Sequence, residues 1–273
     1  MKKRIGALLL TLVLLLCVLP CAGAEGTVEA AETITVETLL SSCKDASLKG
    51  RTELVRALHD CVVGQMKVSI AQQEYDNAKS AQEDANERFL MGGALQAELD
   101  EADKALTTAK TALDKAQLEQ LKRVTLVREL TNLDIRDVTL DAQGLFLTLK
   151  PENLVLSQLQ NAAAALSEDT EKTNLQLEQD YIDVTLSYTQ IGTAASDYRT
   201  AVTARDDTAK ALVMGKAQAA ELKQATMAMK QARLTLFEAI SSYSLLLYSI
   251  NETCAGTLSD QAGLLSAYLG TNA

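Results

Sequence analysis

The sequence has no tryptophan, only one histidine and only two prolines, and aromatic residues make up just 4% of it. A globular enzyme of this length normally needs bulkier core residues and more loop-forming residues around its site. With His59 as the single histidine, neither a histidine metal cluster nor a histidine relay can form. No phosphate-binding loop, dinucleotide fingerprint or nucleophile elbow is present either. The sequence therefore predicts a protein that is not an enzyme and has no cofactor or metal site, with His59 structural or exposed.

Basic surface is also scarce, because the formal net charge is −10. Phosphate backbones are bound by basic faces, so no nucleic-acid partner is expected. The one compact basic cluster, Lys2 to Arg4, precedes an apolar stretch over 7–19 and the small residues Ala22-Gly23-Ala24. This order is typical of an export signal. We expect residues 1–24 to be a signal peptide.

The mature chain is then predicted to begin at Glu25. Two alternatives stay open. The first is an uncleaved anchor, although a membrane-spanning helix needs about 20 apolar residues and this stretch is shorter. The second is lipidation at Cys21, for which Pro20 is an unfavourable neighbour. No later segment is apolar for long enough to span a bilayer as a helix. The sequence thus predicts an exported protein of the periplasm, outer membrane or cell surface and leaves membrane association open.

Three cysteines follow the signal, namely Cys43, Cys61 and Cys254. An odd number excludes a complete disulfide framework. Cys43 and Cys61 would lie about 27 Å apart on one helix and could not bond each other. Cys254 could meet one of them if the first and last helices are neighbours, but buried thiols are the favoured interpretation.

An internal repeat appears when the sequence is shifted by 123 residues. Residues 75–116 then align without a gap to residues 198–239, and 15 of the 42 positions are identical. Alanine-rich composition and a shared heptad phase raise this number, but the Met-Gly pair at 91–92 and 214–215 is not explained by phase alone. Duplication is the better interpretation.

Each repeat has apolar residues at alternating steps of four and three, which predicts long helices that pack along a seam. The seam alternates a large residue with alanine, and alanine lets helix axes approach closely. The positions expected to pack in this way are Ala102, Ala109, Ala225 and Ala232. After the first turn the predicted seam begins at Leu95.

The helices are expected to reverse direction at Gly92 and Gly215, since glycine accepts the left-handed conformation that ends a helix. Glu98 and Glu221 would then lie in or near the first turns of the returning helices, where a negative charge suits the helix dipole. The alternative is a glycine inside one uninterrupted helix, at a cost of roughly 1 kcal/mol.

The predicted fold class is all-α: two tandem long antiparallel helical hairpins with a short β-hairpin connector. The first hairpin repeat is expected over 25–133, with a helix from about 36 to 90 interrupted near Gly50. A β-like connector follows over 134–150, because Val138–Leu149 is apolar, β-branched and turn-bearing. The second hairpin repeat spans 151–251 and starts at Pro151, and 252–273 is expected to be a flexible tail.

The stretches Phe89-Leu-Met-Gly-Gly-Ala-Leu-Gln-Ala-Glu-Leu99 and Leu212-Val-Met-Gly-Lys-Ala-Gln-Ala-Ala-Glu-Leu222, with the heptads after them, resemble the TolC-type outer-membrane efflux family. The resemblance implies a homotrimeric helical tunnel whose hairpin tips contact a periplasmic adaptor and an inner-membrane pump. It places the partner contact at Met91, Gly92, Gly93, Met214, Gly215 and Lys216. Family members carry Ser or Thr where this chain has Leu95 and Gln218, and the membrane-strand segments are weak or missing, which implies a shortened member.

Two other functions remain as alternatives. A structural coiled-coil protein of the envelope without a transport role would have similar seams. A membrane-fusion-type adaptor also uses a long helical hairpin, but it would need β-domains on both sides of one hairpin.

Overall fold

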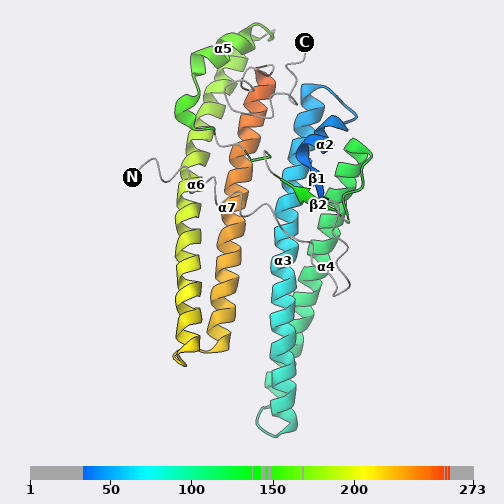
Figure 1. Cartoon of the computed structure of the whole chain (residues 1–273), viewed down its shortest axis with the longest axis vertical. Coiled ribbons are helices and arrows are strands. Elements are labelled where there is room, and N and C mark those ends of the chain that lie inside the picture. Colours follow the sequence, from blue (N-terminus) through cyan, green and yellow to red (C-terminus); the bar gives the residue numbers. More distant parts are fainter. Residues whose placement is uncertain are drawn as a thin grey trace. The chain divides into compact units, whose positions relative to one another are not determined.

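The computed structural model describes residues 33–136, 138–142, 145–146, 149–167 and 169–254, together with Gly256 and Leu258. Over these residues the fold is all-α, with one sheet of two short strands (Figure 1). The elements in chain order are β1 (Thr33–Thr35), α2 (Val36–Ser41), α3 (Leu48–Leu90), α4 (Gln96–Thr131), β2 (Thr139–Asp141), the 3-10 helix η1 (Pro151–Asn153), α5 (Leu156–Ala164), α6 (Thr170–Val213) and α7 (Ala219–Thr253). The four long helices are rich in Ala, Leu, Gln, Glu and Lys, all strong helix formers.

The chain forms two compact units. The first takes its described residues from Met1–Asp60, Arg123–Thr189 and Ile240–Ala273, and the second consists of Cys61–Lys122 and Gln190–Ala239. Each long helix contributes residues to both units, and both helix reversals belong to the second. Each hairpin predicted from the sequence therefore supplies part of both units.

The connector contains a strand, but its partner differs from the prediction. β2 lies where the sequence predicted the first arm of a β-hairpin, yet it pairs with β1 in parallel, with Ile34 opposite Leu140. Parallel strands cannot be joined by a tight turn, so the pairing brings together two segments that are distant in the sequence. Of the predicted second arm, the described residues Leu145, Phe146 and Leu149 are buried instead of forming a strand.

The break in the first helix lies earlier than predicted. α2 ends at Ser41 and α3 begins at Leu48, so Gly50 is helical. A Cβ added at Gly50 would lie 2.4 Å from the Cβ of Asp45 and 2.6 Å from its carbonyl oxygen. Gly50 is therefore needed for the close approach of the 42–47 segment and does not end a helix.

The helix predicted to start at Pro151 is also divided. Pro151 opens η1, and α5 follows as a separate short helix before α6 begins at Thr170. The side chain of Asp169 accepts a hydrogen bond from the backbone N–H of Lys172 at 3.0 Å. This is an N-cap contact, and it satisfies one of the four N–H groups that have no partner at the start of a helix.

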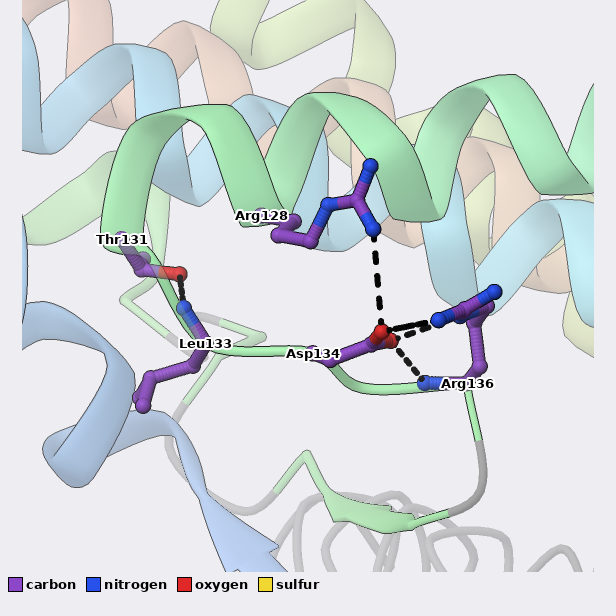
Figure 2. Close-up of polar contacts among 5 residues, drawn as sticks. All are labelled: Arg128, Thr131, Leu133, Asp134 and Arg136. Atoms are coloured by element: carbon purple, nitrogen blue, oxygen red, sulfur yellow. Dashed lines mark hydrogen bonds and ion pairs between the residues drawn. The ribbon is translucent and has the colours of Figure 1, made fainter.

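Polar side chains fix the end of α4 (Figure 2). Asn132 adopts a left-handed conformation with φ 65°, which ends the helix. Beyond it, the Asp134 carboxylate accepts hydrogen bonds from the backbone and side chain of Arg136 and lies 3.8 Å from a guanidinium nitrogen of Arg128. The hydrogen bonds from Arg136, supported by the two positive charges, lower the pKa of Asp134 to about 2. The chain therefore leaves α4 in one defined direction.

The core of the first unit is built around His59, whose side chain is fully buried on α3. Its Nε2 lies 3.1 Å from the carbonyl oxygen of Leu145 and its Nδ1 lies 2.8 Å from Oγ of Ser241 on α7. Because a carbonyl only accepts, Nε2 carries the proton and Nδ1 accepts from the Ser241 hydroxyl. The ring also meets Phe146 edge-on, with centroids 4.7 Å apart. Burial lowers the pKa of His59 to about 4, so the ring is neutral near pH 7.

A second hydrogen bond attaches the connector to α7. The hydroxyl of Tyr243 donates to the carbonyl oxygen of Leu149, and its ring lies 5.6 Å from that of Tyr188 on α6. Burial raises the pKa of Tyr243 above its ordinary value, so the hydroxyl keeps the proton that it donates. Together with His59, this bond holds the otherwise irregular segment against α3 and α7.

In the second unit, polar contacts at intervals join α3 to α7. Lys67 forms an ion pair with Glu238 at 2.8 Å. Nζ of Lys230 donates to Oε1 of Gln73 at 3.0 Å, and Nζ of Lys223 donates to Oγ of Ser80 at 3.2 Å. As the residue number rises on α3 it falls on α7, so the two helices are antiparallel neighbours.

Several of the predicted heptad positions are buried or half-buried in this unit. Ala71, Ala85 and Leu113 are buried. The four seam alanines are half-buried, at positions 102, 109, 225 and 232. Gln82 interrupts the first series, and its Nε2 donates to Oδ1 of Asp103 on α4 at 2.9 Å. The interrupting residue therefore has a polar partner across the hairpin.

The C-terminal part differs from the flexible tail predicted from residue 252. α7 continues to Thr253, and Cys254 and Leu258 are fully buried. The backbone N–H of Leu258 donates to Oδ1 of Asn251 at 3.0 Å. The predicted signal over 1–24, the start at Glu25 and the rest of the tail lie outside the described residues. None of the described helices has the length and apolar character needed to cross a bilayer.

Candidate partner-binding site at the hairpin tips

Both helix reversals are tight turns centred on a left-handed glycine. At the first, Gly92 has φ 75°, the N–H of Gly92 donates to the carbonyl of Phe89 at 2.9 Å, and the N–H of Gly93 donates to that of Arg88 at 2.8 Å. A bond that reaches back five residues around a left-handed residue is the Schellman motif that ends many helices. The first predicted turn is therefore present, and it begins directly after Leu90.

The second turn has the same construction. Gly215 has φ 68°, its N–H donates to the carbonyl of Leu212 at 3.0 Å, and the N–H of Lys216 donates to that of Ala211 at 2.8 Å. Each of these bonds is the counterpart, 123 residues later, of a bond at the first turn. We call the residues 90–95 and 213–218 the first and second tips.

Apolar side chains at both tips point into solvent. The exposed fractions are 75% for Leu90, 77% for Met91 and 70% for Leu95 at the first tip, and 89% for Val213 and 60% for Met214 at the second. The remaining residues predicted for partner contact, Gly92, Gly93, Gly215 and Lys216, are also exposed. Methionine and leucine around a turn of fixed conformation form a surface suited to packing against another protein.

Leu95 corrects one sequence expectation. The heptad pattern predicts Leu95 as the first seam residue of the returning helix, but Leu95 precedes α4 and is exposed. The heptad pattern could not show this, because a residue in phase with the seam is buried only where the partner helix extends beside it. Leu90 and Val213 were not predicted as contact residues, although each directly precedes a predicted Met-Gly pair.

Charged residues differ between the tips. At the first, Arg88 pairs with Glu98 across the turn at 3.5 Å. At the second, residue 211 is alanine, and Glu221 instead accepts a hydrogen bond from the backbone N–H of Gln218 at 3.2 Å. Both glutamates lie in the first turns of α4 and α7, as predicted. A partner would therefore meet two tips with the same backbone and different surface charge.

No metal-binding cluster competes with the tips among the described residues. Among them, no group of three or more His, Cys, Asp or Glu side chains lies close enough together to hold a metal ion. His59 is buried in the core with both ring nitrogens hydrogen-bonded. The tips are accordingly the strongest candidate site in the described part of the chain.

No protein-family model matches the chain. A search of curated proteins found no match either. Among solved structures, the chain is similar to the CmeC outer membrane channel of Campylobacter jejuni, with a TM-score of 0.48 and 13% sequence identity. The alignment covers 82% of this chain and 67% of the channel. Likeness at this level assigns no function.

Replacing Gly92 by alanine is expected to lower the free energy of unfolding by about 1–2 kcal/mol, the cost of a side chain in the left-handed conformation. A Cβ at Gly92 would have nothing within 4 Å, so the whole cost is conformational. Gly93→Ala is the matched control, because its Cβ would make only an ordinary contact with the carbonyl of Arg88 at 3.5 Å. Urea unfolding followed by circular dichroism measures both. Equal effects at the two positions would contradict the assigned turn.

Proposed function

We propose that this chain is a non-enzymatic, TolC-like component of an envelope export system, in which the helical hairpins act as a shaft that contacts an adaptor or pump through its tips. The observation that carries this proposal is the set of five exposed apolar side chains at the two tips, Leu90, Met91, Leu95, Val213 and Met214. The resemblance of the sequence around Gly92 and Gly215 to the TolC-type family supports the same assignment.

The tips suit binding for a second physical reason. Fixing a flexible loop on association costs free energy, whereas a turn already held by its own hydrogen bonds avoids most of that cost. Each tip has a left-handed glycine and a backbone bond of 2.8 Å that spans the turn. The apolar side chains are therefore presented in a fixed conformation before any partner arrives.

Photo-crosslinking in the native envelope tests the proposal. A photoreactive amino acid at Met91 or Met214 is expected to give adducts with an export adaptor or pump, identified by mass spectrometry. Leu175 on α6 is the matched control position, because it is also apolar and 62% exposed but lies away from the tips. Adducts that form as readily from Leu175 as from the tips would contradict a tip-specific contact.

Charge introduced at the tips should disrupt the contact. Met91→Glu with Met214→Glu is expected to reduce the adaptor adduct, trapped from a neighbouring tip position such as Leu90, by at least roughly tenfold, because two carboxylates would need to be desolvated at the contact. Leu175→Glu should leave it unchanged. Cells that lack the chain should also retain an exported compound. Unchanged retention together with an altered envelope would favour the structural coiled-coil alternative.

A further inference from the structure

Buried polar side chains are concentrated between α3 and α7 in the first unit. Among the described residues, six polar side chains other than those of cysteine and tyrosine are buried, and only Thr131 of α4 lies outside these two helices. With Tyr248, the members on α7 follow one another in steps of three and four, the spacing of a helix seam. We call the following residues the polar seam: Thr52 and His59 on α3, and Ser241, Ser244, Tyr248 and Asn251 on α7.

Contacts of His59 place the two halves of the polar seam at the same height. His59 is hydrogen-bonded to Ser241, and its ring centroid lies 6.4 Å from that of Tyr248, so His59 is level with the turn of α7 between them. Because the helices are antiparallel, seven residues toward the start of α3 correspond to seven residues toward the end of α7. Thr52 is therefore level with Asn251.

The same two helices have different buried residues in the second unit. There the buried side chains of α3 and α7 belong only to apolar residues and one cysteine: Cys61, Met66, Ile70, Ala71, Ala85, Leu234, Leu236 and Phe237. A long helical seam in this chain can thus be built without buried polar groups. The polar seam is a local feature of the first unit that needs its own explanation.

Two members of the polar seam have a polar atom without a hydrogen-bond partner among the described residues. These atoms are the hydroxyl oxygen of Tyr248 and Nδ2 of Asn251, and both residues are fully buried. Burial raises the pKa of Tyr248 above its ordinary value, so its hydroxyl keeps the proton and can donate it. A buried polar group that has lost its hydration and gained no partner is unfavourable, and such groups are rare in folded proteins.

His59 cannot serve as the partner of Tyr248. The two rings meet edge-on, but both ring nitrogens of His59 are already hydrogen-bonded, Nε2 to the carbonyl oxygen of Leu145 and Nδ1 to Ser241. The hydroxyl of Tyr248 therefore needs a partner other than the ring beside it.

The amide of Asn251 is fixed with its donor unpaired. Its Oδ1 accepts a hydrogen bond from the backbone N–H of Leu258 at 3.0 Å, and because an N–H only donates, Nδ2 must occupy the other side of the amide. At the same level, the hydroxyl of Thr52 donates to the carbonyl oxygen of Leu48 at 2.9 Å and retains lone pairs that can accept. An acceptor is thus present at the height of Asn251, without a direct bond to it.

The chemistry of the polar seam indicates which molecule binds there. None of its members is charged near pH 7, because the pKa of His59 is lowered to about 4. A buried ion would therefore lack an opposite charge, and this is costly. A water molecule is uncharged and can both accept and donate two hydrogen bonds, so it can join an amide or hydroxyl donor to a nearby oxygen. Buried polar sites bind water, whereas apolar cavities stay dry.

We propose that the polar seam is a site for internal water, with one molecule hydrogen-bonded to Nδ2 of Asn251 at the level of Thr52 and another hydrogen-bonded to the hydroxyl of Tyr248. In the first unit α3 and α7 therefore meet through hydrogen bonds and water, whereas in the second unit their buried side chains are apolar. The inference does not depend on the function proposed for the tips.

A crystal structure of the purified chain, at a resolution that shows ordered water, tests the proposal directly. Density for a water oxygen is expected at roughly 2.5–3.2 Å from Nδ2 of Asn251 and from the hydroxyl oxygen of Tyr248. A protein atom bonded to either group in place of the water, or no density beside it, would overturn the proposal. This measurement needs no substitution.

Removing the hydroxyl of Tyr248 gives an independent test in solution. Tyr248→Phe keeps the ring but removes the group that binds water. The equilibrium constant for unfolding, measured with urea and circular dichroism, is expected to rise by roughly two- to tenfold, the effect of losing one hydrogen bond. A hydroxyl without a partner predicts the opposite, because its removal would relieve an unfavourable buried group. A fall in the constant would therefore count against bound water.

Tyr243→Phe is the matched control, because the hydroxyl of Tyr243 donates directly to the carbonyl oxygen of Leu149. Its loss leaves a buried carbonyl without that donor, so the unfolding constant should rise here as well. Rises at both positions support a bonded hydroxyl at each. A rise at Tyr243 beside a fall at Tyr248 would show that only the first is bonded and would overturn the water site.

Discussion

Lowering the pH from 7.5 to 4.5 is expected to reduce the free energy of unfolding by about 2–3 kcal/mol through His59 alone. In the folded chain the pKa of His59 is lowered to about 4 by burial, whereas an unfolded histidine has its ordinary value of 6.5. Between these values the unfolded state binds the proton and the folded state does not. Stability is therefore complete above about pH 6.5 and falls as the pH drops toward 4.

His59→Gln is the matched control, since a glutamine amide can also donate to the carbonyl of Leu145 and accept from Ser241 but does not titrate. His59 is the only histidine in the sequence, so its replacement removes the only side chain whose ordinary pKa lies between these two pH values. Urea unfolding at both pH values measures the difference. If the wild type and the variant lost stability equally, burial would not lower the pKa of His59.

Two replacements of a helical glycine by alanine are expected to change the free energy of unfolding in opposite directions. Gly50→Ala should destabilise the chain by about 2–3 kcal/mol, because the new Cβ would lie 2.4 Å from the Cβ of Asp45 and would displace the segment before α3. Gly192→Ala should stabilise it by about 1 kcal/mol, because the position is helical and its Cβ would have nothing within 4 Å.

Each glycine serves as the control for the other, since both lie in long helices and receive the same methyl group. Urea unfolding at neutral pH gives the two free-energy changes. Free-energy changes of the same sign would show that the room available for the added Cβ does not decide the change in stability. Gly50 would then not be required for the close approach of Asp45.

The sequence predicted the features that repeat along it. Apolar residues at steps of four and three identified the long helices. The two Met-Gly pairs located both turns, because a left-handed glycine ends a helix whatever segments pack around it. Features that depend on a distant segment were not predictable in this way. The sequence alone predicts Gly50 as a helix breaker, since nothing local shows that Asp45 lies against it.

The connector illustrates the same limit. Its residues 139–141 have a local preference for a strand and form one, but the partner is β1, about a hundred residues earlier in the chain. His59 is a buried core residue, but its partners Ser241 and Leu145 come from parts of the chain that no local pattern links to it. At the candidate site, the glycines and methionines were predicted, while the exposure of Leu95 depended on where the neighbouring helix stops.

The polar contacts between α3 and α7 have a consequence for the specificity of folding. A seam that repeats every seven residues is nearly unchanged when one helix slides by seven, so apolar packing alone would permit several axial registers. Such a slide would separate Lys67 from Glu238 and Lys230 from Gln73, and it would leave half-buried polar groups without partners. These contacts contribute little to stability, but they exclude the slipped alternatives and select one alignment of the two hairpins.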